Sequence, residues 1–267
     1  IRLGYKVAIC EQIEDVAKSR ERGSKSIVRR DVVRIVTQGT LTEDNLLSAR
    51  KHNYLAALGQ AEETFSFAWI DVSTGEFFTQ LVEKESLAAV LARINPRELL
   101  ISNSQKNRSE IREMLESLNV CQTELPAVNF ESISGARRLK TLFKVKTLDS
   151  FGTFSRSELA ASGALIYYIS LTQKGRLPRI EVPSRIVTGS VMEIDFATRR
   201  NLELTSTLSG DYKGSLLSVV DRTDTGSGAR LLAFRLSQPL TCPEIITERL
   251  DMVETFVQAE KLRGILQ

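Results

Sequence analysis

Phe65-Ser-Phe-Ala-Trp-Ile-Asp-Val-Ser-Thr-Gly-Glu-Phe-Phe-Thr-Gln-Leu-Val82 is the stretch that decides the fold of its part of the chain. Its first arm carries apolar side chains at both odd and even positions, which is typical of a strand covered on both faces. We therefore predict a strand inside a sheet and not at its rim. The side chains expected on one face are Phe65, Phe67 and Trp69, and those expected on the other are Ala68, Ile70 and Val72.

A turn and a second strand complete this stretch. Ser73-Thr74-Gly75 supplies turn chemistry, and Gly75 is free to adopt a positive φ. Phe77 and Phe78 begin the return arm. The hairpin contains the only Trp and four of the eleven Phe residues, so we predict that it nucleates the core of one domain.

Length and composition indicate a soluble protein of more than one domain. The chain has 267 residues, of which 42% are hydrophobic, enough for two or three small domains with real cores. No apolar run approaches the length of a membrane span. The chain begins at Ile1 without Met, so we expect it to be a piece of something larger. Cys10, Cys121 and Cys242 form no Cys-x-x-Cys pair, which favours a reducing cytoplasm.

Few residues offer catalytic chemistry. His52 is the only histidine, so no Ser-His-Asp set can be built, and we interpret it as an exposed linker residue with nothing to orient it. Cys10 ends an apolar strand and is interpreted as a small core residue. Thr225-Gly-Ser-Gly-Ala-Arg230 lacks the Lys of a phosphate loop, so we interpret it as a loop-to-helix junction.

Asp71 is the strongest candidate for metal chemistry. A carboxylate at the end of a central strand is where ribonuclease H-like nucleases place their first metal ligand, and two-metal catalysis needs several converging carboxylates. Glu76 lies across the turn, and Glu98 would lie at the far end of the sheet if its strand runs parallel to that of Asp71. We therefore favour a structural role for Asp71 as a turn brace and keep a divergent metal-dependent nuclease as the alternative.

Hydrophobic periodicity divides the chain into an α/β part and a helical part. Apolar and β-branched residues predict strands at 4–10, 27–36, 54–58, 98–102 and 120–123, and helices at 84–94 and 111–118. This order describes an α/β layer with a mixed sheet. From Ser157 onward the pattern is helical, with Asp195 as an N-cap and a long helix after Pro243. The apolar face expected on that last helix comprises Ile246, Leu250, Val253 and Val257.

Positive charge is unevenly spread, although the net charge is only +3. One basic segment contains Lys18, Arg20, Arg22, Lys25, Arg29, Arg30 and Arg34, and another contains Arg137, Arg138, Lys140, Lys144 and Lys146. A solvated face is the simpler interpretation of each segment. Contact with phosphate or with an acidic partner is the alternative.

Several blocks resemble a known family. They are Gly4-Tyr-Lys-Val-Ala-Ile-Cys-Glu-Gln12, Val32-Val-Arg-Ile-Val-Thr-Gln-Gly-Thr40, Asp71-Val-Ser-Thr-Gly-Glu-Phe77, Asp195-Phe-Ala-Thr-Arg-Arg-Asn-Leu-Glu-Leu204, Gly228-Ala-Arg-Leu-Leu232 and Gln238-Pro-Leu240. In order and spacing, these blocks resemble the bacterial MutS family of DNA mismatch repair proteins across essentially the whole chain. Gln38 is a departure, because the family usually has Pro there.

The resemblance implies a layout. Residues 1–40 would be the tail of the mismatch-binding domain, a partial α/β piece, and residues 41–52 a linker. Residues 53–152 would be the connector domain, with a ribonuclease H-like mixed sheet but no nuclease activity. Residues 157–267 would be the first part of a helical core domain.

The resemblance also implies which activities belong elsewhere in the full-length protein. The family reads mismatches with a Phe-x-Glu motif and hydrolyses ATP with Mg²⁺ at a phosphate loop, and this sequence contains neither motif. We therefore expect no catalytic, cofactor or metal site and no enzymatic activity in this chain.

The partners implied by the resemblance are MutL, mismatched double-stranded DNA and a second MutS subunit, in the cytoplasm and without a membrane. Arg137 and Arg138 are the residues that we expect to contact MutL. Arg29, Arg30 and Arg34 are candidates for contact with the DNA backbone.

Overall fold

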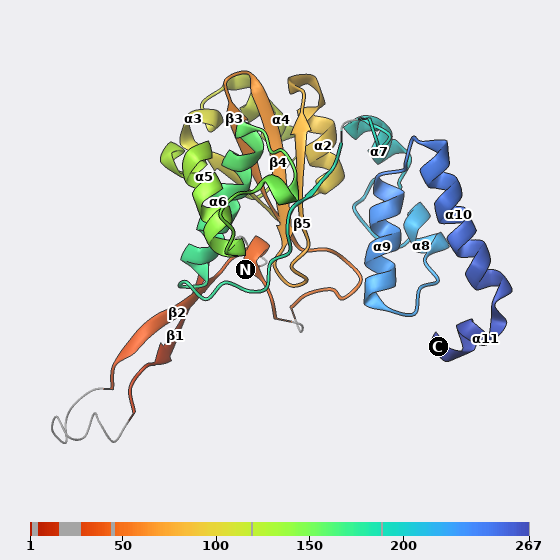
Figure 1. Ribbon diagram of the computed structural model, residues 1–267, viewed down its shortest axis with the longest axis horizontal. Coiled ribbons are helices and arrows are strands. Elements are labelled where there is room, and N and C mark those ends of the chain that lie inside the picture. Colours follow the sequence, from red (N-terminus) through yellow and green to blue (C-terminus); the bar gives the residue numbers. More distant parts are fainter. Residues whose placement is uncertain (2–4, 16–27, 44–45, 119, 188, 267) are drawn as a thin grey trace. The chain divides into compact units, whose positions relative to one another are not determined.

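A computed structural model describes residues 1, 5–15, 28–43, 46–118, 120–187 and 189–266. They form two units, residues 1–186 and residues 187–267, each of which has its own internal packing (Figure 1). The first unit contains a two-stranded sheet and a six-stranded sheet. The second is helical.

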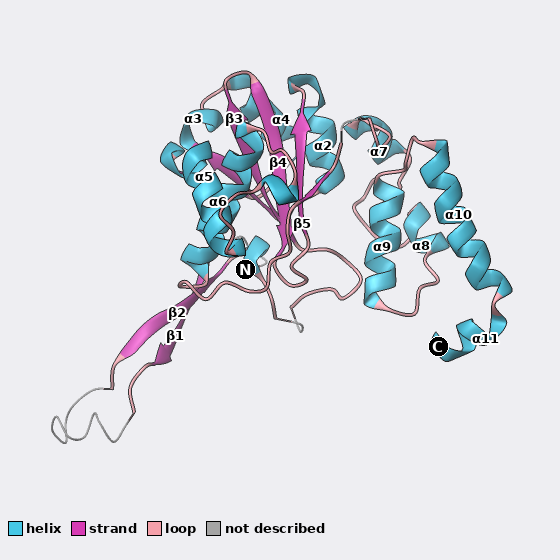
Figure 2. Cartoon of the chain, viewed as in Figure 1, coloured by secondary structure: helices cyan, strands magenta, loops and turns pink. Residues whose placement is uncertain are grey.

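The six-stranded sheet of the first unit is mixed (Figure 2). Its order is β7-β6-β3-β4-β5-β8. β3, β4 and β5 pair antiparallel, whereas β6 and β7 continue parallel to β3, and β8 pairs parallel to β5. The strands are β3 (Tyr54–Ala61), β4 (Thr64–Asp71), β5 (Phe77–Val82), β6 (Glu98–Ser102), β7 (Gln122–Leu125) and β8 (Ser184–Arg185). The predicted α/β layer with a mixed sheet is confirmed.

The hairpin lies inside this sheet, as predicted. β4 pairs with β3 on one side and with β5 on the other. The turn residue Gly75 has φ 86°, which confirms the expected positive φ. The two faces of β4 also separate as expected, because Phe65, Phe67 and Trp69 belong to one buried cluster and Ala68, Ile70 and Val72 to another.

Helices α2 (Leu87–Ile94) and α4 (Ser109–Leu118) cover the face of the sheet that carries Trp69. Helical spacing in α2 buries Leu87, Val90, Leu91 and Ile94. The helix ends where Asn95 adopts a left-handed φ of 46° just before Pro96. The short helix α3 (Asn103–Lys106) follows β6 and begins at a capping box of Ser102 and Gln105.

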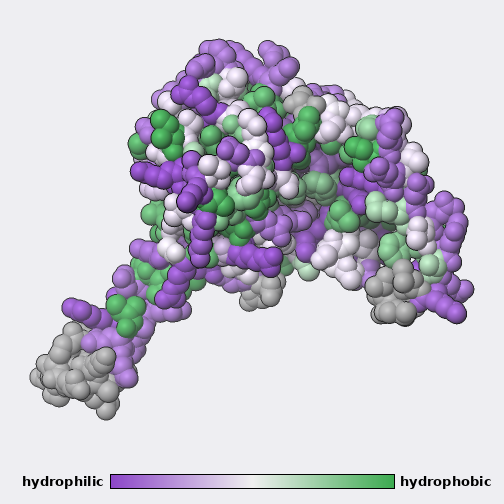
Figure 3. All heavy atoms as spheres, in the orientation of Figure 1, coloured by the Kyte–Doolittle hydropathy of each residue, from purple (hydrophilic) through white to green (hydrophobic). Residues whose placement is uncertain are grey.

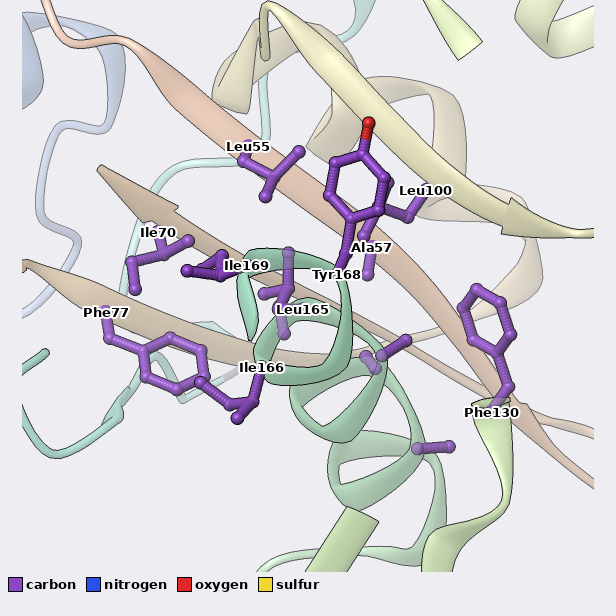
Figure 4. Packing of buried hydrophobic residues seen from close by; sticks show 14 of the residues in the cluster. Leu55, Ala57, Ile70, Phe77, Leu100, Phe130, Leu165, Ile166, Tyr168 and Ile169 are labelled. Atoms are coloured by element: carbon purple, nitrogen blue, oxygen red, sulfur yellow. The ribbon is translucent and has the colours of Figure 1, made fainter. Parts of the chain in front are cut away.

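Two stacked helices cover the opposite face. α6 (Arg156–Thr172) packs directly on the sheet, and α5 (Ser132–Phe143) packs on α6. Small residues allow both approaches: a Cβ on Gly59 would lie 2.2 Å from Ser157 O, and one on Gly163 would lie 2.2 Å from Gly135 Cα. Figure 4 shows Leu165 and Ile169 of α6 facing the sheet.

The position of α6 differs from the sequence-based interpretation. We expected the helix beginning near Ser157 to open the helical core domain. It is instead the central layer between the sheet and α5, and it belongs to the first unit. The reason is visible in its composition: apolar and small residues occur on all sides, which suits a helix buried on two faces better than an amphipathic bundle helix.

The N-terminal residues form an arm. β1 (Val7–Gln12) and β2 (Arg30–Val36) pair antiparallel, with an irregular register between Ile9 and Cys10. Cys10 is exposed, so its interpretation as a core residue is wrong. An apolar strand is usually covered by other elements, whereas in the described residues β1 pairs only with β2. The short helix η1 (Gln38–Thr40) follows β2 and leads into the linker.

The second unit contains helices α7 (Phe196–Asn201), α8 (Leu216–Val220), α9 (Gly226–Ser237), α10 (Pro243–Gln258) and α11 (Glu260–Leu266). Asp195 caps α7 by accepting a 2.9 Å hydrogen bond from Thr198 N, as predicted. Thr225 caps α9 by accepting from Gly228 N at 3.0 Å, which confirms the loop-to-helix interpretation. Within the described residues, no helix has the length and hydropathy needed to span a membrane.

Candidate functional site

Asp71 braces the turn that follows β4. Its carboxylate accepts hydrogen bonds from Ser73 N at 3.0 Å, Ser73 Oγ at 2.6 Å and Asn53 N at 3.0 Å. Burial raises the pKa of Asp71, but the hydrogen bonds from His52, Ser73 and Asn53 outweigh it and lower that pKa to about 2. The carboxylate is therefore ionised at neutral pH, and the predicted structural role is confirmed.

His52 is not the exposed linker residue that we expected. Its side chain is only 11% exposed, and its ring stacks on Tyr54 with 4.6 Å between centroids. Nδ1 lies 3.3 Å from Asp71 Oδ2 and 3.4 Å from Glu76 Oε2, so two carboxylates orient it. Nothing in the local sequence signals this contact, because strand pairing brings Asp71 beside His52 from 19 residues away.

Glu98 lies at the same end of the sheet as Asp71, because the two strands are not parallel, which was the condition for the far end. β4 and β6 run in opposite directions, since β3 pairs antiparallel with one and parallel with the other. Asp71 is opposite Tyr54, and Glu98 is opposite Leu55. Because neighbouring strand residues alternate between faces, the two carboxylates point to opposite sides of the sheet. They do not converge.

Glu98 is the buried polar centre that sequence reasoning missed. Oε2 accepts from Thr37 Oγ1 and from Gly39 N at 3.0 Å, and Oε1 accepts from Thr123 Oγ1 at 2.6 Å and Tyr168 Oη at 2.7 Å. Burial, together with the nearby Glu98 carboxylate, raises the pKa of Tyr168, so its hydroxyl remains a donor. The four donors come from three segments far apart in the sequence, so no spacing rule points to them.

This arrangement does not support the nuclease alternative. Asp71 and Glu98 lie on opposite faces, and both oxygens of Glu98 already accept two hydrogen bonds each. Among the residues that the structure describes, no group of three or more His, Cys, Asp or Glu side chains is placed to hold a metal ion.

The two arginines predicted to contact MutL have different roles within α5, a helix that the sequence analysis did not recognise. Arg137 is exposed. Arg138 is half-buried, donates to Asn129 O at 2.9 Å and to Gly163 O at 3.3 Å, and lies over the Tyr167 ring. Burial lowers the pKa of Arg138. Its side chain therefore fastens α5 to α6, which leaves Arg137 as the available cation of the pair.

A shallow hollow lies beside Arg137, between α5 and the start of α6. Its volume is about 520 Å³. The lining side chains are Ser132, Ile133, Ala136, Arg137, Lys140, Arg156 and Leu159. Ile133 is 83% exposed, so an apolar group stands at the surface among three basic side chains. This combination of apolar floor and cationic rim is suited to binding another protein.

The basic residues of the N-terminal arm also divide. Arg29 and Arg30 are exposed at the start of β2. Arg34 instead donates to Thr40 O at 3.1 Å and Thr42 Oγ1 at 2.8 Å and pairs with Glu43 at 2.9 Å. Its guanidinium thus holds the segment after η1. The other basic residues of this cluster, Lys18, Arg20, Arg22 and Lys25, lie outside the described residues.

Three family models match successive parts of the chain. MutS domain I matches residues 1–45, MutS domain II matches residues 53–181, and MutS domain III matches residues 197–267. The domain II match contains the six-stranded sheet with α2, α4, α5 and α6, except β8. The domain III match begins at the second residue of α7 and contains the other helices of the second unit.

Individual relatives agree with these matches. The DNA mismatch repair protein MutS of Cereibacter sphaeroides (strain ATCC 17025 / ATH 2.4.3) is 49% identical over 267 residues, which is 100% of this chain and 30% of the relative. The MutS proteins of Roseobacter denitrificans and Paracoccus denitrificans are 46% and 48% identical over the same 267 residues, again 30% of their length. This chain thus spans about 30% of these relatives. With successive matches to three MutS domains and relatives of this name along its whole length, the chain belongs to the MutS family of DNA mismatch repair proteins.

Proposed function

We propose that this chain is the linking part of a MutS protein, which connects a DNA-binding region to an ATPase region and helps to dock MutL. The similarity over three successive MutS domains supports this placement. In the cytoplasm, the full-length protein would bind mismatched double-stranded DNA, pair with a second MutS subunit and use ATP with Mg²⁺. Within that protein, this chain would transmit movement between the DNA-binding and ATPase regions and hold partners.

A ribonuclease H-like fold without nuclease activity is part of this proposal. The sheet supports it, since the antiparallel strands β3, β4 and β5 are followed by β6 and β7 parallel to β3, with helices on both faces. The orientation of Asp71 and Glu98 to opposite faces is the reason to expect no cleavage. The sequence also contains no Gly-x-x-x-x-Gly-Lys-Ser/Thr run, so we expect no ATP hydrolysis by this chain alone.

MutL docking is assigned to the α5 surface, comprising Ile133, Arg137, Lys140 and the hollow beside them. The observation that carries this assignment is the exposed Ile133 among basic side chains. An apolar anchor surrounded by charge is the usual anatomy of a protein interface. Arg138 contributes indirectly, because it holds the helix that presents the surface.

A charge-reversal experiment tests this assignment. In a full-length MutS that carries this chain, Arg137→Glu with Lys140→Glu should weaken MutL binding at least about tenfold in titration calorimetry, since reversed rim charges repel an acidic partner. Arg108→Glu with Arg112→Glu is the matched control, because these exposed arginines lie in or beside α4 on the opposite face of the sheet. Equal MutL affinity of both double variants would move docking away from α5.

DNA-backbone contact through Arg29 and Arg30 is a second element of the proposal, supported by their exposure. Phosphate contacts release counterions, so Arg29→Ala with Arg30→Ala should make the full-length protein's DNA affinity less dependent on salt. The slope of log affinity against log salt should shrink by up to about 2, one for each lost contact. An unchanged slope would show that these arginines are only solvated.

A further inference from the structure

We propose that Glu98 and Tyr168 form a socket that receives both strands of the N-terminal arm, and that Glu98 is the positioning residue that fixes the arm on the six-stranded sheet. The socket is a separate feature from the MutL-docking surface and from the linkage to the ATPase region. Only its consequence rests on the proposed function: movement of a DNA-binding region would pass into the sheet through this joint.

The socket joins the end of β2 to the sheet. Thr37 Oγ1 and Gly39 N both donate to Glu98 Oε2, while Thr123 of β7 and Tyr168 of α6 donate to Oε1. Glu98 is 1% exposed, so the carboxylate is satisfied by these donors away from bulk water. One side chain thus connects the arm, two strands and a helix.

Gly39 fits the socket because it has no side chain. A Cβ at this position would lie 2.7 Å from Leu55 Cδ1 and 2.9 Å from Glu98 Cβ. The same segment is held a second time, because Asn53 Nδ2 donates to Gln38 O at 2.9 Å while Asn53 N donates to Asp71. The turn is also closed internally, since Thr37 N donates to Thr40 Oγ1 at 3.0 Å.

The residue that precedes β1 also contacts the socket, through Tyr168. Lys6, which immediately precedes β1, places Nζ 5.5 Å from the centroid of the Tyr168 ring, a cation–π distance. Tyr168 therefore contacts the β1 side of the arm through its ring, and its hydroxyl donates to the carboxylate that holds the β2 side. Both ends of the arm thus meet at this one pair of residues.

The chemistry of the donors predicts how substitutions should rank. The hydroxyls of Thr37, Thr123 and Tyr168 can rotate and accept, whereas Gly39 N can only donate. A Gln at position 98 can keep its oxygen toward Gly39 and turn its amide toward Thr123 and Tyr168. Glu98→Gln should therefore loosen the joint mildly, and Glu98→Ala should release it because a buried N–H loses its acceptor.

Hydrogen–deuterium exchange in a full-length MutS that carries this chain, without DNA or MutL, tests the socket. The peptide containing Gly39 should exchange about ten- to a hundredfold faster in Glu98→Ala than in the parent, because a hydrogen bond to a charged group is lost. Glu98→Gln and Tyr168→Phe should give smaller increases. Peptides of β4 should keep their exchange rates in Glu98→Gln, which separates local release from general unfolding.

Glu158→Gln is the matched control. Glu158 is an equally buried carboxylate that accepts from Ser155 N at 2.8 Å and from Arg185 Nε at 2.9 Å, and neither donor belongs to the arm. Glu158→Gln should leave the exchange rate of the peptide that contains Gly39 unchanged. Unchanged Gly39 exchange in all three socket variants, or equal acceleration in Glu158→Gln, would overturn the socket. Neither result bears on MutL docking, which is measured separately, so the two proposals can fail independently.

Discussion

Helices α6 and α10 are almost equal in length, 17 and 16 residues, but have opposite environments. Twelve residues of α6 are buried, between the sheet and α5, whereas no residue of α10 is buried in the described structure. The first unit thus closes a core of its own, while the second presents apolar side chains at its surface (Figure 3). We therefore expect the first unit to be more stable than the second when neither has further contacts.

The exposed face of α10 matches the amphipathic pattern of its sequence. Leu250 is 62% exposed and Val257 is 59% exposed, although both lie on the predicted apolar face. We expect that face to be covered in the full-length protein, since relatives are more than three times as long as this chain. If so, the first unit is the rigid part of the link, and the second unit is ordered by contacts with other parts of the full-length protein.

The largest expected effect comes from the core of the first unit. Phe67→Ala should destabilise that unit by roughly 3–5 kcal/mol, because Phe67 is fully buried and leaves a cavity. Urea unfolding followed by the fluorescence of Trp69, the only tryptophan, reports on this unit alone. Leu250→Ala in α10 should change the same transition by less than about 0.5 kcal/mol. Similar losses of stability in both variants would show that α10 and β4 contribute equally to this transition.

A substitution at the contact between α5 and α6 should cause the second largest loss of stability. Gly163→Ala would place a Cβ 2.2 Å from Gly135 Cα, so the helices must separate, at a cost of about 1–3 kcal/mol. Gly264→Ala in α11 is the control, because nothing lies within 4 Å of its Cβ and Ala favours helix. Thermal unfolding should show a lower midpoint for the first variant and an equal or higher one for the second.

Asp71 should give a smaller effect that depends on pH. Its folded-state pKa of about 2 lies below the ordinary 3.8, so the ionised group stabilises the fold above about pH 4 and loses that contribution as pH falls toward 2. Asp71→Asn should therefore cost about 2 kcal/mol at pH 7. The difference from the parent should shrink between pH 4 and pH 2. A difference in stability that stays constant from pH 4 to pH 2 would show that the ionised Asp71 does not stabilise the turn.

The hairpin shows what the sequence could predict. Two-sided apolar alternation in 65–72 specified both the interior position of β4 and the separation of Phe67 from Ala68. The caps at Asp195 and Thr225 were also predictable, because capping depends on residues within one turn. These features are local, and local chemistry decides them.

The missed features depend on contacts between distant segments. The place of Glu98 followed from the antiparallel direction of β4 relative to β6, which no single segment reveals. The contacts of His52 with Asp71 and Glu76 likewise depend on how distant strands pair. The sequence pattern places α6 in the helical core domain, because a buried helix in an α/β unit and a helix of a bundle have similar apolar patterns. The structural role of Arg138 depends on its contact with the Tyr167 ring of α6, which the sequence of α5 does not reveal.

Hydrogen–deuterium exchange on the 267-residue chain tests most directly whether the first unit is the rigid part of the link. We expect the amides of β3, β4, β6 and α6 to exchange slowest, near the global unfolding limit, and those of α10 to exchange many times faster. The same α10 peptides should become protected in the full-length protein. Protection of α10 equal to that of β4 in the 267-residue chain would show that the first unit is not the more rigid of the two.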